Sequence, residues 1–134
     1  MTNPLLQLEG LPSFPEIQAE HMLPAIESVV ANARAGIDKI LISDSHTYDS
    51  LVHVREELES RINEVWSPIS HMNSVVNSEE IRTAHQASLE ILTAYHTEIG
   101  QNKGLYDAYQ SLRVSQQFEM LSFEQQKVMT FLNL

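Results

Sequence analysis

The sequence contains no cysteine, which excludes a disulfide-braced scaffold, a cysteine-ligated zinc finger and a thiol nucleophile. Basic residues are also scarce, since 8 Lys and Arg stand against 18 Asp and Glu for a formal net charge of −10. Nucleic acids and anionic membranes both attract basic surfaces, so we expect neither as a partner. No apolar run approaches the roughly 20 residues of a membrane-spanning helix, and the first residues do not resemble a signal peptide. These absences predict a cytoplasmic protein.

Alternation of apolar and polar residues, the mark of a β-strand, is absent as well. Apolar residues instead recur every three or four positions, which predicts an all-α fold. We expect a single N-terminal domain over residues 1–134, built as an antiparallel bundle of about five helices. The expected helices cover residues 20–43, 48–76, 79–100, 104–115 and 123–134. Pro4, Pro12 and Pro15 predict an extended arm over residues 1–18.

Individual side chains mark where these helices begin or are interrupted. Thr47 or Asp49 can cap the second helix through a side-chain oxygen, and Ser78 can cap the third. Pro68 lies inside the second apolar stripe. The helix therefore either kinks there or stops at Ser67 and restarts, and the pattern leaves both open.

The fifth helix bears on whether the chain is complete. Ser122 and Gln125 have the spacing of a capping box at its start. The helix then stays apolar up to Leu134, without the glycine or basic last turn that commonly ends a helix. A helix cut from a longer protein and a natural terminal helix docked on the bundle both fit this pattern.

Six histidines invite a search for a metal site. The sequence has no His-Glu-x-x-His zinc motif, no Glu-x-x-His pair and no Gly-x-Ser-x-Gly elbow, so we assign no catalytic residue. Asp49, His53 and Glu57 are the metal-ligand candidates, because they stand at successive i+4 positions on one helix face. An exposed polar face of an amphipathic helix explains the same spacing.

One stretch is unusual for a helix: Ser67–Ser78 places proline, serines, histidine and asparagines inside an apolar pattern. Together with the segments Glu20–Ala25 and Gly100–Arg113, it resembles the N-terminal region of bacterial members of the thimet oligopeptidase family of zinc metallopeptidases. Ala19 departs from the family pattern, which has proline there, and the similarity weakens from about Val114 onward. The resemblance nonetheless covers nearly the whole chain.

The resemblance implies a much longer helical enzyme in which zinc, held by a His-Glu-x-x-His motif, hydrolyses short peptides inside a deep channel. None of those ligands occurs in this sequence, so zinc is the cofactor of the parent enzyme and not of this chain. The chain would be a non-catalytic domain, inactive alone, that forms the wall or rim of the channel and limits substrate size. Its partners would be the C-terminal catalytic region of the same polypeptide and short peptide substrates. Ser67, Ser70, His71 and Asn73 are the candidates for facing the peptide. A helix kink adapted to Pro68 and packed by its own polar groups is the alternative explanation of this segment.

The alternative is a stand-alone helical interaction module that self-associates through apolar faces. A domain without its catalytic half would also expose apolar surface, and large exposed apolar patches bind partners. Both interpretations therefore allow a homodimer of the isolated chain.

Overall fold

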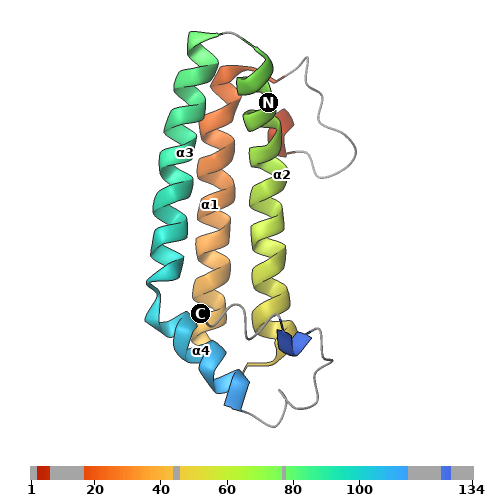
Figure 1. Ribbon diagram of the computed structural model, residues 1–134, viewed down its shortest axis with the longest axis vertical. Helices are drawn as coiled ribbons and strands as arrows, with labels where there is room; N and C mark the ends of the chain where they lie inside the picture. The colour runs from red at the N-terminus through yellow and green to blue at the C-terminus, as the bar shows by residue number, and fades with distance from the viewer. Residues whose placement is uncertain (1–2, 7–16, 44–45, 77, 115–124, 128–134) are drawn as a thin grey trace.

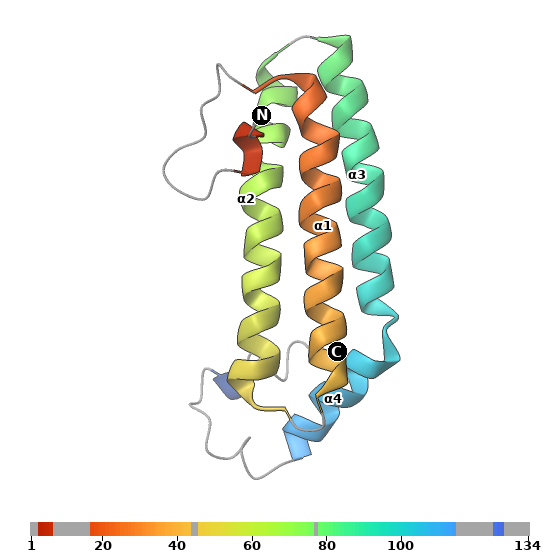
Figure 2. The same ribbon diagram turned by 180° about the vertical axis from the view of Figure 1, so that it is seen from behind.

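The computed structural model describes residues 3–6, 17–43, 46–76, 78–114 and 125–127. Within these residues every regular element is a helix, which confirms the predicted all-α fold. Three long helices, α1 (Ala19–Ile42), α2 (Val54–Val75) and α3 (Glu79–Gly100), stand side by side, and the shorter α4 (Lys103–Val114) lies across their lower end (Figures 1 and 2).

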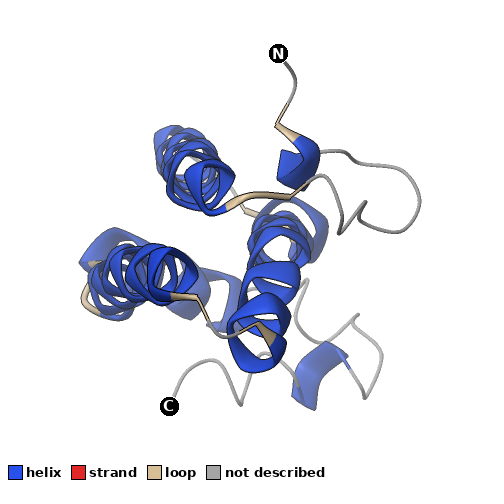
Figure 3. Cartoon of the chain, turned by 90° about the horizontal axis from the view of Figure 1, so that it is seen from above, coloured by secondary structure: helices blue, strands red, loops and turns tan. Residues whose placement is uncertain are grey.

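The direction of the long helices decides which ends meet. The short connections reverse the chain after α1 and again after α2, so that α1 and α3 run in the same direction with α2 antiparallel to both (Figure 1). Seen from above, the three helices occupy the corners of a triangle (Figure 3). The N-terminal turns of α1 and α3 consequently lie next to each other at one end of the bundle.

The core fills the centre of this triangle with apolar side chains that recur at helical spacing on each helix. Its most deeply buried members are Met22, Ala25, Ile26, Val30, Ala33, Ile62, Val65 and Ile69. A second cluster closes the lower end, where α4 packs beneath α1. This cluster comprises Ile37, Ile40, Leu51, Val52, Leu105, Ala108, Tyr109 and Leu112.

Two of the predicted capping residues, Ser78 and Thr47, form caps in the structure. The Ser78 hydroxyl accepts a hydrogen bond from the backbone N–H of Ile81 (3.4 Å) at the start of α3. Thr47 Oγ1 accepts one from Ser50 N (3.0 Å), and Ser50 Oγ accepts one in return from Thr47 N (2.8 Å). This cap opens a π-helical segment, η3 (Tyr48–His53), which leads into α2 and which the apolar spacing did not predict.

Helix α2 continues through Pro68 and does not restart there. Proline has no N–H to donate to the carbonyl of Glu64 four residues earlier, which ordinarily breaks or kinks a helix. The ring of Pro68 is itself buried, as is the neighbouring Ile69. Burial of the ring against the bundle therefore offsets part of the lost hydrogen bond.

Of the expected extended arm over residues 1–18, the structure describes residues 3–6 and 17–18, and residues 4–6 are not extended. Pro4–Leu6 form a 3₁₀ turn, η1, and Leu5 is buried. Asn3 Nδ2 donates to the carbonyl of His21 (2.8 Å), and Arg61 donates to the carbonyl of Leu6 (3.1 Å). These bonds fasten the turn to α1 and α2. Residues 7–16 lie outside the described residues.

The predicted fifth helix can be compared with the structure only at residues 125–127, which are helical. The proposed cap Ser122 and the rest of residues 123–134 lie outside the described part of the chain. Helix α4 begins one residue before the prediction, and Asn102 Oδ1 accepts from Leu105 N (3.0 Å) at its start.

Candidate functional site

The metal-ligand candidates do not assemble into a site. His53 Nε2 and Glu57 Oε1 lie 3.1 Å apart on the exposed side of α2. Asp49 does not join them, and within the described residues no group of three or more His, Asp or Glu side chains is placed to hold a metal ion. Residues eight apart are separated by about 12 Å along a helix axis, so Asp49 and Glu57 are too distant to share an ion bound at about 2 Å.

The four candidate peptide-facing residues lie on two different faces of α2. Ser67 and His71 are exposed, whereas Ser70 and Asn73 are half-buried. Ser70 and Asn73 continue the helical stripe of Trp66, whose ring stacks on that of His85 in α3 with centroids 4.8 Å apart. Asn73 Oδ1 is buried and has no hydrogen-bond partner within the described structure. The segment therefore offers Ser67 and His71 to the outside and uses its other stripe for packing.

A set of polar contacts joins the lower halves of the long helices. Arg34 of α1 donates to Glu98 of α3 (2.9 Å), and Glu59 Oε1 of α2 lies 2.5 Å from His96 Nε2 of α3. The Arg34 guanidinium also lies 5.9 Å from the centre of the Tyr95 ring. Each contact connects two helices, and surface pairs of this kind typically contribute at most about 1 kcal/mol. We therefore interpret these interhelical contacts as structural and not as part of a binding site.

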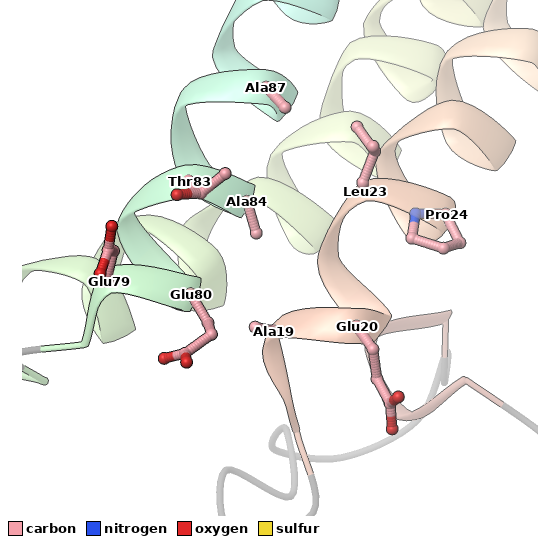
Figure 4. Close-up of a pocket in the computed structure, with 9 residues that line it drawn as sticks. All are labelled: Ala19, Glu20, Leu23, Pro24, Glu79, Glu80, Thr83, Ala84 and Ala87. Atoms are coloured by element: carbon pink, nitrogen blue, oxygen red, sulfur yellow. The ribbon is translucent and has the colours of Figure 1, made fainter.

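A hollow of the described surface lies between the N-terminal turns of α1 and α3 (Figure 4). We call it the α1–α3 groove. It is open to solvent, encloses about 590 Å³, and is lined by Ala19, Glu20, Leu23, Pro24, Glu79, Glu80, Thr83, Ala84 and Ala87. Its floor is apolar, and the three glutamates lie at the end of it where α1 and α3 begin (Figure 4).

The glutamates of the groove are placed by the chemistry of helix ends. Acidic side chains in a first turn are stabilised by the unpaired N–H groups and the dipole of the helix. The Ser78 hydroxyl donates to Glu80 (2.9 Å). The backbone N–H of Glu80, and after it this hydroxyl, hold the pKa of the Glu80 carboxyl below its usual value. Glu80 therefore carries its negative charge at neutral pH.

Sequence reasoning missed this groove. The signal present in the sequence is a set of small residues, Thr83, Ala84 and Ala87, on the first turns of α3. These small residues line a groove only because α1 runs beside α3 in the same direction, and the sequence pattern of α3 alone does not contain this tertiary arrangement.

Among the described helices, none combines the length and the apolar character that a membrane span requires.

Comparison with known proteins gives this helical chain a family. The sequence model of the neurolysin/thimet oligopeptidase N-terminal domain matches residues 26–131. Oligopeptidase A of Haemophilus influenzae is 42% identical over 127 residues, which are 95% of this chain and 19% of that protein. Oligopeptidase A of Escherichia coli is 36% identical over 128 residues, with the same two coverages of 95% and 19%.

A plant relative extends the similarity beyond bacteria. The chloroplastic/mitochondrial organellar oligopeptidase A of Arabidopsis thaliana is 28% identical over 127 residues, which are 95% of this chain and 16% of that protein. The chain thus spans about a fifth of the length of the bacterial relatives. The resemblance seen in Ser67–Ser78 and Gly100–Arg113 is confirmed, and the chain belongs to the neurolysin/thimet oligopeptidase family, in which it corresponds to the N-terminal domain.

Proposed function

We propose that this chain is the non-catalytic N-terminal domain of a zinc-dependent oligopeptidase that hydrolyses short peptides. One observation carries the proposal: the chain belongs to an oligopeptidase family, yet its 134 residues contain no His-Glu-x-x-His motif. Zinc and the catalytic groups would then come from the C-terminal region of the same polypeptide. The cytoplasm is the compartment we propose, since the chain has no cysteine and a large negative charge.

The domain would form the wall or rim of the peptide channel and limit the size of the substrate. Helices α1, α2 and α3 have 24, 22 and 22 residues, which corresponds to lengths of about 33–36 Å. Packed side by side over a shared core, they make a stiff surface suited to a channel wall. Ser67 and His71 are exposed on α2, and we propose that they face the peptide.

The absence of activity is tested with the chain alone. A quenched fluorescent peptide is incubated with the purified 134-residue chain and zinc, and in parallel with the whole polypeptide. We expect hydrolysis only by the whole polypeptide. Zinc-dependent cleavage by the isolated chain, abolished by a chelator, contradicts the proposal.

The size-limiting role is tested in the whole polypeptide with peptides of increasing length. Ser67→Trp adds bulk to the exposed face of α2 and is expected to shorten the longest peptide that is cleaved. Ser28→Trp makes the same change on an exposed face of α1 and serves as the control. An unchanged length limit in the Ser67 variant argues against a channel position for this face.

The second candidate function, self-association through an interaction module, has one observation in its favour. Val75 and Val76, at the turn between α2 and α3, are 63% and 39% exposed. Adjacent exposed valines of this kind are unfavourable in water and can be covered by a second copy. Sedimentation velocity of the isolated chain decides the matter: a dimer that Val75→Ser and Val76→Ser dissociate supports this function, and a monomer at high concentration excludes it.

A further inference from the structure

The apolar floor of the α1–α3 groove is left partly exposed by the described helices. Leu23 and Ala84 are half-buried and Pro24 is exposed, so the floor keeps contact with water. Figure 4 shows Leu23 and Pro24 on α1 opposite Ala84 on α3, with Glu20, Glu79 and Glu80 on the first turns of the two helices. Exposed apolar surface bordered by charged residues is a common form of a docking site.

The surface shape of α3, with a hollow on each side of Thr83 and Ala87, suits a helix or an extended segment that lies across it. On the far side of Thr83 and Ala87 a second hollow of about 630 Å³ is lined by Glu79, Arg82, Thr83, Gln86, Ala87 and Glu90. Thr83 and Ala87 thus form a low ridge between two hollows. Helices pack by placing the side-chain ridges of one into the grooves of another, and small residues allow a close approach.

The charge at the groove indicates what chemistry covers it. Glu20, Glu79 and Glu80 are all exposed, and none of the described residues that line the groove is basic. A covering segment that combines an apolar face with Lys or Arg would bury the floor and pair with these carboxylates at its edge. An acidic or neutral segment would bring no opposite charge to these carboxylates beside a new apolar interface.

A second copy of this chain does not fit that requirement. With 18 acidic and 8 basic residues each copy carries a formal charge of −10, and two copies repel each other at the acidic groove. The bacterial relatives continue well beyond the region matched here, since this chain covers 19% of their length. A segment with an apolar face and flanking Lys or Arg would therefore come from the rest of the polypeptide.

We infer that the α1–α3 groove is the docking surface for a basic amphipathic segment from the remainder of the same polypeptide. The inference rests on the proposed function, in which such a remainder exists. It adds a specific surface and a specific partner chemistry: apolar side chains over Leu23, Ala84 and Ala87, with Lys or Arg at the three glutamates.

Amide hydrogen exchange of the isolated chain and of the whole polypeptide tests the inference. We expect exchange in residues 19–24 and 79–87 to be slower in the whole polypeptide by roughly tenfold or more, because docking suppresses local opening of these turns. Ala87→Arg places a cation on the ridge and should abolish this slowing. Ala31→Arg, on an exposed face of α1 away from the groove, should preserve it.

The charge of the partner is tested by reversal. Glu20→Lys combined with Glu79→Lys should weaken the protection, whereas Glu27→Lys, outside the groove, should not. Equal exchange in the isolated chain and the whole polypeptide overturns the inference, as does protection that the paired reversal leaves unchanged. Concentration-dependent protection of the isolated chain overturns it in favour of a second copy. Peptidase activity is not the readout, so a failure of the proposed function is recognised separately.

Discussion

Ser88 places a hydroxyl group in the core of the bundle. The residue is fully buried, and its Oγ has no hydrogen-bond partner within the described structure. An unsatisfied buried polar group costs about 1–3 kcal/mol. We therefore predict that Ser88→Ala raises the free energy of unfolding by about 1 kcal/mol, as measured by urea denaturation. Ser60→Ala, an exposed change of the same kind in α2, controls for helix propensity, and equal gains in both variants contradict the assignment.

Ionisation of the Tyr95 phenol is coupled to folding. Burial raises the pKa of its phenol above the ordinary 10.0, the Glu59 carboxylate raises it further, and Arg55 and Arg34 oppose the shift. Because the unfolded chain releases this proton at lower pH than the folded chain does, the contribution of Tyr95 to stability is present below about pH 10 and is lost above it.

Alkaline denaturation tests this coupling. We expect the free energy of unfolding to fall from about pH 9 to about pH 11, and to fall less steeply in Tyr95→Phe, which has no phenol proton to lose. Tyr106→Phe is the matched control, since Tyr106 is 56% exposed. An identical pH dependence in wild type and Tyr95→Phe contradicts a shifted phenol at this position.

At the scale of the helices, the end of α3 holds a glycine that the backbone does not require. The residue after Gly100, Gln101, has a φ of −102°, so the helix does not end in the left-handed conformation that favours glycine. A Cβ at Gly100 would meet nothing within 4 Å. Gly100→Ala should therefore raise the free energy of unfolding by about 0.5–1 kcal/mol, measured by thermal or urea denaturation.

Gly36 provides the contrast for this prediction. A Cβ there would lie 2.8 Å from Leu58 Cδ1, because α1 and α2 approach closely at this point. Gly36→Ala should gain less than Gly100→Ala or lose stability, since Leu58 must move. A larger gain at Gly36 than at Gly100 contradicts the packing described for the two helices.

Pro68 makes α2 less stable than its apolar pattern alone would allow. A proline inside a helix costs about 3 kcal/mol relative to alanine, and the burial of its ring returns part of that cost. We predict that Pro68→Ala raises the free energy of unfolding by about 1–2 kcal/mol. A loss of stability in this variant means that packing of the ring outweighs the missing hydrogen bond.

The same element shows what the sequence could and could not predict. Thr47 and Ser78 were predictable as caps because a hydroxyl bonding to nearby N–H groups is a local matter. The path of the chain through Pro68 was not, because it depends on the ring being buried by other helices. The 3₁₀ turn at Pro4–Leu6 was missed for the same reason: Asn3 bonds to His21, and Arg61 bonds to Leu6 from α2.

At the scale of the whole molecule, the site was harder to predict than the fold. The spacing of Asp49, His53 and Glu57 is a linear pattern, and in three dimensions it yields only the His53–Glu57 pair. The α1–α3 groove has almost no linear signature, since it joins turns about sixty residues apart in the chain. The family, in contrast, was visible in the polar segment Ser67–Ser78, and the comparisons confirmed it.

The central claim is that this bundle is the N-terminal, non-catalytic part of a longer zinc oligopeptidase. The most direct test is to read the gene beyond the codon for Leu134. We predict that the reading frame continues for several hundred codons and encodes a His-Glu-x-x-His helix. A stop codon directly after Leu134 contradicts the account and leaves an independent helical module in its place.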